Sequence, residues 1–184
     1  MLNVRNNLQH LDVEEIQAIA RSRYLPFSVC TFNIEGRLNI STIIRSAQAL
    51  GAKEVIVFGR RRFDLRGCVG TQNYIPVTKV DGLTEEGNID CEEFRRFVSI
   101  HDYTPIYAEV GGSDYRTTNF RSISNPLLVL GEEQQGIPEE LLTDIQVEIP
   151  MVGVTRSFNV GVAGSIIMEE ISRQLRGRKD KCNG

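Results

Sequence analysis

Two polar side chains near the C-terminus lie where a strand, a loop and a helix are expected to meet. Ser157 and Asn159 follow the strand-like segment 147–149, Pro150 and Gly153, and they precede a segment that is almost entirely apolar or small. The first turn of a helix has free backbone N–H groups, which bind polar or anionic ligands. An ordinary corner in which Ser157 caps the helix is the simpler alternative. The segment therefore predicts either a ligand site or a helix cap.

Two further segments combine candidate site residues with a predicted strand or helix. The strand-like run 127–130 leads into the loop 131–136, which has the form G-x-E-x-x-G and carries Glu133 between two glycines that let the backbone approach a ligand closely. A helix is expected over 39–50, with Arg45 on a face away from its apolar stripe. That stripe consists of Ile40, Ile43, Ile44, Ala47 and Leu50.

Strand and helix patterns alternate along the chain, which predicts one α/β domain with helices on both faces of a sheet. A stretch of loop with a short helix is expected at 60–75. Strands are predicted at 27–32, 54–58, 76–80, 105–109, 127–130 and 146–149, and helices at 13–23, 39–50, 91–100, 138–143 and 158–176.

Taken in order, three patterns resemble the motifs of the SpoU-type RNA ribose 2′-O-methyltransferases of the SPOUT superfamily. They are N-x-S-x-x-x-R from Asn39, G-x-E-x-x-G from Gly131, and I-P-M-x-G-x-x-x-S-F-N-V from Ile149. Each pattern alone is common, but here all three lie in the family's order and at predicted strand-helix junctions. The resemblance covers roughly residues 25–175.

The resemblance implies a SPOUT-type fold: a parallel sheet flanked by helices, with its C-terminal third threaded into a trefoil knot, in a homodimer. We expect this domain at 26–176, after a short helical extension at 1–25 and before a basic tail at 177–184. The last helix has little polar surface over its first two turns and contains Gly161 and Gly164. We therefore expect it to be buried on nearly every side, with close helix packing and a second subunit supplying one wall.

The resemblance also implies S-adenosylmethionine (SAM) as the cofactor, bound largely through backbone groups. Core packing is an alternative or additional role for Ile149 and Phe158. By motif position the contacts are Glu109, Leu130, Gly131, Ile149, Met151 and Phe158.

For catalysis, Arg45 matches the arginine that the family uses near the RNA phosphate and ribose. A guanidinium is a poor base, so we expect Arg45 to bind phosphate and stabilise charge on the ribose oxygen. Asn39 is expected to orient Arg45 or the substrate, or to cap its helix. Glu133 is expected to hold Arg45 or a loop amide, and Ser157 and Asn159 to position the substrate or brace the loop.

The motifs depart from the family pattern at three positions. Leucine and a second serine are usual in place of Phe158 and Gly161, and glycine is common in place of Ser41. Phe158 is expected to reshape the adenine pocket. The catalytic candidates remain, so we expect an active enzyme.

Charge and composition narrow the choice of partner. The net charge of −3 argues against a protein that coats nucleic acid indiscriminately, but it does not exclude a local basic patch. Arg60, Arg61 and Arg62 follow a predicted strand end and are candidate RNA contacts. The resemblance bears on the substrate, because many rRNA-modifying members of that family carry an extra N-terminal RNA-binding domain, whereas the first 25 residues here have room for only a short helix. This favours tRNA over rRNA as substrate, with rRNA recognised through a partner as the alternative.

Other classes of site and location are disfavoured. The four cysteines and two histidines are scattered without zinc-site or disulfide spacing, so we expect no metal, and Cys30 is expected to be a buried apolar residue. No apolar run could span a membrane and the N-terminus lacks a signal-peptide core, which predicts a cytoplasmic protein.

Two alternative functions stay open. One is a knotted dimer that binds RNA, or RNA and SAM, without transferring a methyl group. The other is a Rossmann-like or flavodoxin-like nucleotide or flavin protein. It is disfavoured because neither G-x-G-x-x-G after the first strand nor a P-loop is present.

Overall fold

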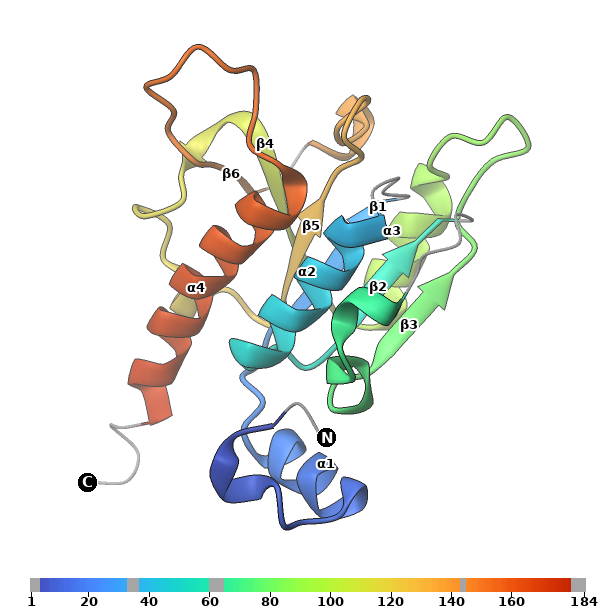
Figure 1. The fold of residues 1–184 in the computed structure, drawn as a ribbon. Helices are drawn as coiled ribbons and strands as arrows, with labels where there is room; N and C mark the ends of the chain where they lie inside the picture. Colours follow the sequence, from blue (N-terminus) through green and yellow to red (C-terminus); the bar gives the residue numbers. More distant parts are fainter. Residues whose placement is uncertain (1–3, 33–36, 60–64, 143–144, 180–184) are drawn as a thin grey trace.

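A six-stranded parallel sheet forms the centre of the protein (Figure 1). A computed structural model describes residues 4–32, 37–59, 65–142 and 145–179. The sheet has the order β3-β2-β1-β5-β4-β6, and every ladder in it is parallel. The strands are β1 (Ser28–Phe32), β2 (Val55–Phe58), β3 (Val77–Val80), β4 (Thr104–Asp114), β5 (Pro126–Leu130) and β6 (Ile145–Glu148).

Helices cover both faces of this sheet, as predicted. Both central strands, β1 and β5, are buried at every residue, because a parallel sheet covered on two faces leaves no side of a strand in water. The helices are α1 (Val13–Ser22), α2 (Arg37–Ala49), α3 (Cys91–Ile100) and α4 (Val160–Lys179). Short 3-10 turns are η1 (Asn6–Leu8), η2 (Leu65–Cys68), η3 (Thr71–Asn73), η4 (Phe120–Ser122) and η5 (Glu139–Leu141).

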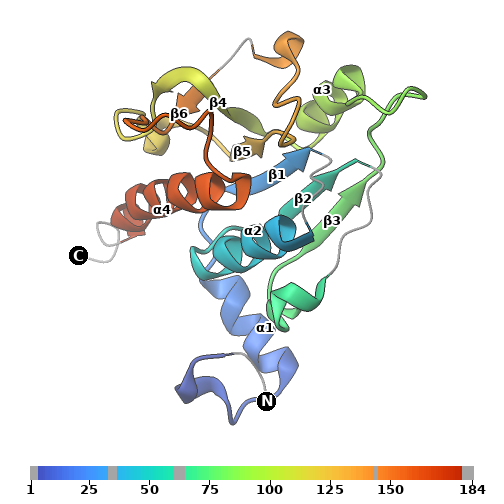
Figure 2. The ribbon, with the colours of Figure 1, turned by 45° about the horizontal axis from the view of Figure 1, so that its top comes forward.

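Two apolar clusters lie on opposite faces of the sheet. On one face, α2 and α4 run side by side and pack against Val29 and Leu128 (Figure 2). On the other face, α3 contributes Phe94 beside Cys30 and Val129. Alternate residues of each strand thus enter different clusters, which fixes the register of the sheet.

The N-terminal extension lies at the end of the sheet opposite the carboxyl ends of the strands (Figure 1). Its helix α1 begins after Asp12, whose side chain forms a capping box with Glu15. Ile16 and Ala20 pack against Tyr74, in a small cluster separate from the two main ones. The prediction of a short helix entered from Asp12 is confirmed.

Several predicted boundaries are wrong. Helix α2 begins at Arg37 rather than Asn39, and α4 spans Val160–Lys179 rather than 158–176, so the predicted tail begins inside this helix. The predicted helix 138–143 is only the turn η5, because a segment this short gains too few hydrogen bonds to offset the cost of starting an α-helix. Strand β4 continues past residue 109 after an irregularity in its pairing.

In the single chain α4 is buried on one side only, so the expected burial on nearly every side stays a prediction that depends on a second subunit. Ile167 and Ile171 are buried against the sheet, but Val162 is 45% exposed, because only one side of the helix faces α2 and β5. Close packing at the two glycines is confirmed. A Cβ at Gly161 would lie 3.3 Å from Thr42 of α2, and one at Gly164 would lie 2.6 Å from the Leu130 side chain.

Candidate active site

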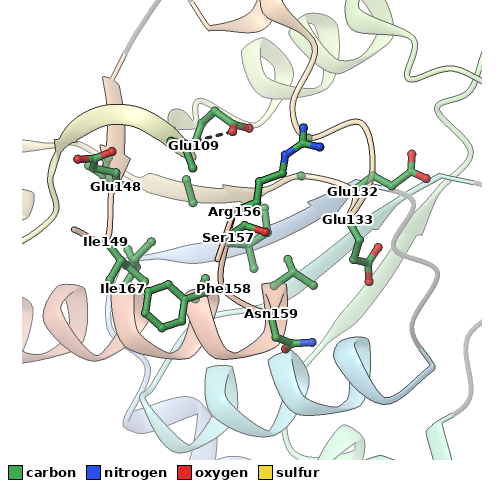
Figure 3. A pocket seen from close by; sticks show the side chains of 18 of the residues that line it. Glu109, Glu132, Glu133, Glu148, Ile149, Arg156, Ser157, Phe158, Asn159 and Ile167 are labelled. Atoms are coloured by element: carbon green, nitrogen blue, oxygen red, sulfur yellow. Dashed lines mark hydrogen bonds between the residues drawn. The ribbon is translucent and has the colours of Figure 1, made fainter. Parts of the chain in front are cut away.

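A cavity of about 620 Å³ opens at the carboxyl ends of β4, β5 and β6 (Figure 3). This edge of an open parallel sheet is where ligands bind in α/β proteins, and the volume lies within the usual range for small-molecule sites. Its walls come from the β4 irregularity, the loop after β5, the loop after β6 and the start of α4. The floor is apolar and buried, and consists of Leu130, Val147 and Ile167.

The G-x-E-x-x-G loop is a tight reversal whose two glycines face each other. Glu132 and Gly136 exchange two backbone hydrogen bonds, of 3.1 and 2.9 Å. Gly136 has a φ of +69°, and a Cβ at Gly131 would lie 2.5 Å from the Gly136 carbonyl carbon. Both positions thus require glycine so that the loop can close on itself. The two glycines let the loop approach itself closely, and their predicted approach to a ligand stays a prediction.

The wall formed by β4 is a bulge. Val147 of β6 pairs with both Ala108 and Ser113, so the residues between them leave the ladder. The Glu109 carboxylate accepts the N–H of Ile137 at 3.2 Å and the N–H of Val110 at 3.1 Å. Bulges of this kind re-aim side chains at functional sites. Here the Glu109 carboxylate ties the bulge to the loop after β5.

The second carboxylate of this wall fixes the far end of the bulge. Glu148 accepts the N–H of Gly111 at 2.8 Å. Gly111 has a φ of +93°, and a Cβ on Gly112 would lie 2.7 Å from the Val147 backbone. Two acidic side chains therefore hold the cavity wall in shape while also lining it.

A chain of side-chain hydrogen bonds joins the three sequence motifs. The Asn39 amide donates to Glu133 at 2.7 Å, and its oxygen accepts from the Asn159 amide at 2.9 Å. Asn39 lies in the first turn of α2, two residues after the helix begins, so the alternative that it caps this helix is wrong. The three side chains come from α2, the loop after β5 and the residue before α4, and they fix these segments relative to one another.

Asn159, not Ser157, caps the last helix. Its side-chain oxygen accepts the N–H groups of Gly161 at 3.0 Å and Val162 at 3.2 Å. Two of the first-turn N–H groups that we expected to face a ligand are therefore already bonded within the chain. Ser157 is exposed and lines the cavity.

The predicted cofactor contacts converge on this cavity. Phe158 is 42% exposed, so core packing does not explain it, whereas Ile149 lines the cavity and also packs against the core. The lining includes the six predicted residues Glu109, Leu130, Gly131, Ile149, Met151 and Phe158, and the catalytic candidates Glu133, Ser157 and Asn159.

The structure does not bring Arg45 into the cavity. Arg45 lies two turns along α2 from Asn39, in a separate polar depression beside Thr42, Gln48 and Thr71. Arg60, Arg61 and Arg62 lie outside the described residues. The cavity does contain one arginine that was not predicted, Arg156. Its only signal in the sequence is its position inside the third motif, directly before Ser157.

Other kinds of site find no support in the described part of the chain. No three His, Cys, Asp or Glu side chains there converge as metal ligands, and no helix there is both long and apolar enough to cross a bilayer. Cys30 is fully buried, as predicted, and burial raises the pKa of its thiol. The pKa of Cys91 is raised to about 12, chiefly by burial. Neither thiol is a nucleophile at neutral pH.

Comparison with known proteins identifies the family. Residues 26–169 match the SpoU rRNA methylase family. The chain belongs to this family. The resemblance drawn from the three motifs is thereby confirmed, as is the parallel sheet flanked by helices. The match also removes the nucleotide-binding and flavin-binding alternatives.

Individual SpoU relatives cover most of the chain. A tRNA (guanosine(18)-2′-O)-methyltransferase from Thermus thermophilus is 30% identical over 162 residues, which cover 86% of this chain and 80% of that protein. One from Mus musculus is 39% identical over 148 residues, 77% of this chain but only 9% of that protein. The crystal structure of an AdoMet-bound rRNA methyltransferase from Sinorhizobium meliloti has a TM-score of 0.70 at 27% identity, over 87% of this chain and 60% of that one.

Proposed function

We propose that this SpoU family member transfers a methyl group from SAM to a ribose 2′-hydroxyl of RNA. One observation carries the proposal: two of the three motifs line a single cavity, and Asn39 of the first motif is hydrogen-bonded to both. The direct test is transfer of radiolabelled methyl groups from SAM to total RNA. Ribose methylation would support the proposal, whereas a protein that binds both ligands but transfers no label would be the non-catalytic alternative.

The cavity suits SAM in shape and charge. SAM supplies the methyl group when bound. The buried floor of Leu130, Val147 and Ile167 fits an adenine ring, and the exposed Phe158 ring adds apolar surface beside it. Glu109 and Glu148 place carboxylates where the cofactor's positive charges can be balanced. Soaking with SAM, NAD and FMN separately would test this selectivity.

The residues at the cavity entrance are proposed to position the ribose. Asn39 holds the Glu133 carboxylate in one place, so this group needs little reorganisation when substrate binds. The exposed Ser157 hydroxyl is available to the substrate. Holding the reacting groups in line contributes about 7 to 11 kcal/mol to such reactions. These side chains are therefore proposed to orient the acceptor hydroxyl rather than to bind the cofactor.

Arg45 is proposed to bind an RNA phosphate close to the reacting ribose. It lies in the separate depression beside Thr42, a residue that approaches Gly161 at the start of α4. Arg45→Ala should lower the methyl-transfer rate about 10²- to 10³-fold, as loss of a preorganised charge contact does. The affinity for SAM should change little. Arg45→Lys should recover little activity, because an ammonium cannot make a bidentate phosphate contact. Loss of SAM binding with catalysis intact would contradict these roles.

The proposed substrate is tRNA. Two of the relatives carry tRNA in their names, although the family name and the Sinorhizobium relative refer to rRNA. Arg60, Arg61 and Arg62 remain candidate RNA contacts. Mapping of 2′-O-methyl positions in RNA from a strain that lacks the protein would identify the nucleotide, and loss of an rRNA site alone would overturn the tRNA proposal.

We also propose a homodimer in the cytoplasm. Exposed apolar side chains lie in the loop before α4 and in its first turn: Val152, Val154, Phe158 and Val162. A second copy would cover them. Light scattering should give twice the chain mass of 20.7 kDa, and Val162→Asp should shift the protein toward that monomer mass. A monomer in the unmodified protein would contradict the proposal.

The trefoil knot is proposed from family membership. The placing of β5 between β1 and β4, and the contacts of α4 with the 118–121 segment, are compatible with threading of the C-terminal third. Tracing the main chain in an experimental structure would decide it.

A further inference from the structure

Arg156 is the one positive charge in an acidic cavity. Among the described residues that line the cavity, the other charged groups are the carboxylates of Glu109, Glu132, Glu133 and Glu148. Arg156 comes from the loop between β6 and α4, and its side chain lies among the lining residues (Figure 3). RNA is a polyanion, so an entrance with these carboxylates alone would repel it.

The guanidinium of Arg156 is not used by the fold. No hydrogen bond or ion pair joins it to any described residue, although it shares the cavity with carboxylates. Most other described arginines are bonded. Arg95, for example, donates to the carbonyl of Glu140 at 2.7 Å and lies 3.6 Å from its carboxylate. Arg156 is exposed, so it needs no internal partner and can bind a ligand without first breaking a contact.

We propose that Arg156 binds a phosphate of the RNA substrate at the cavity entrance. The inference rests on the proposed methyl transfer to RNA. The buried part of the cavity is apolar, whereas Arg156 is exposed and directly precedes Ser157, at the entrance where the ribose is proposed to lie. A guanidinium presents a planar pair of donors that matches two phosphate oxygens. The positive charge of Arg156 thus offsets the repulsion between the carboxylates at the entrance and one incoming phosphate.

The alternative ligand for Arg156 is the carboxylate of the cofactor. Measurements of RNA binding and of cofactor-analogue binding distinguish an RNA phosphate from this carboxylate. Binding of unfractionated tRNA to Arg156→Ala should weaken about tenfold, as expected for loss of a hydrogen bond to a charged group. The slope of log affinity against log salt should fall by about 0.7 to 0.9, one phosphate contact. The affinities for S-adenosylhomocysteine and for 5′-methylthioadenosine, which lacks the amino-acid part, should both stay within about twofold of the unmodified protein.

Two further variants complete the test. Arg156→Lys keeps the charge, so it should retain the salt dependence but lose part of the affinity for tRNA. Arg95→Ala removes an exposed but paired arginine on α3, and should leave tRNA affinity unchanged. Unchanged tRNA binding by Arg156→Ala would overturn the inference. Weakened binding of S-adenosylhomocysteine but not of 5′-methylthioadenosine would overturn it too, in favour of a cofactor contact. Because these are binding measurements, an unmodified protein that transfers no methyl group would count against the proposed function alone.

Discussion

The hydrogen-bond chain through Asn159 gives a prediction in which helix stability and site geometry can be separated. The Asn159→Ala substitution removes the oxygen that accepts the N–H groups of Gly161 and Val162, and also the amide that donates to Asn39. Loss of an N-cap costs about 0.5 to 2 kcal/mol, and loss of the side-chain hydrogen bond about 0.5 to 1.5 kcal/mol. We therefore expect the free energy of unfolding to fall by about 1 to 3 kcal/mol.

Asn159→Asp is the matched control. An aspartate keeps an oxygen for the two N–H groups and adds a negative charge at the start of α4, which is favourable there. It has no amide to donate to Asn39, so the link toward Glu133 is weakened while the cap remains. Its stability should fall by less than about 1 kcal/mol, because the favourable charge offsets much of the lost hydrogen bond to Asn39, but methyl transfer should be impaired.

Urea unfolding followed by circular dichroism measures the stability of both variants, and initial rates of methyl transfer measure the site. The expected loss for Asn159→Ala corresponds to a melting temperature lower by roughly 2 to 12 °C in a chain of this size. Equal stability of Asn159→Ala and the unmodified protein would refute the capping role. Equal destabilisation by both substitutions would show that the amide, rather than the oxygen, carries the stability.

Three other predictions concern the loops and one end of the sheet. Gly131→Ala should lower stability by about 1 to 3 kcal/mol and reduce the shift in melting temperature on adding S-adenosylhomocysteine, because its Cβ would meet backbone at 2.5 Å; Gly153→Ala, with nothing within 4 Å of the added carbon, should do neither. Gln174→Ala should cost about 1 to 3 kcal/mol in urea unfolding, because it leaves the N–H of Phe120 without the acceptor that it has at 2.9 Å; a neutral result would contradict this role. Burial, together with a hydrogen bond to a neighbouring glutamate, raises the pKa of Tyr103 from 10.0 to about 12, so the folded state holds this proton more tightly than the unfolded state, and stability should fall as the pH rises from about 10 to 12. Tyr103→Phe should show a smaller loss over that range, and an identical pH profile would contradict the assignment.

The strands were predictable because burial on two faces leaves an uninterrupted apolar run. Strand β5 shows this pattern, whereas β1 also contains Ser28 and Thr31, and both strands lie within one residue of their predicted limits. The continuation of β4 past Glu109 was not predictable, because it depends on the pairing of Val147 with two residues of β4. The first residue of the last helix was predicted wrongly for a related reason. Ser157 and Asn159 are both good caps, and only the folded loop decides which oxygen reaches the first turn.

Most of the residues that form the site could be predicted from the sequence, but the contacts among them could not. The family resemblance identified nine residues that line the cavity, yet it gave no sign that Gly131 faces the far end of its own loop. The helical pattern of 39–50 placed Arg45 away from the apolar stripe, but a helical wheel cannot tell which depression a polar face borders. Arg156 lacks any periodic signal, because it lies in an irregular loop whose path is set by contacts distant in sequence.

The position of β5 in the sheet has a consequence for synthesis of the protein. Ser28 of β1 pairs with Leu127 of β5. The edge of β1 that faces β5 therefore has no partner until most of the chain has left the ribosome. Translation proceeds at about 5 to 20 residues per second, and unpaired strand edges promote aggregation during such waits. The early strands β1, β2 and β3 can pair in advance, but the cavity-bearing half of the sheet cannot. Newly made chains therefore pass through a stage in which the proposed cofactor site does not exist, so cofactor binding cannot protect the open edge of the sheet during that stage.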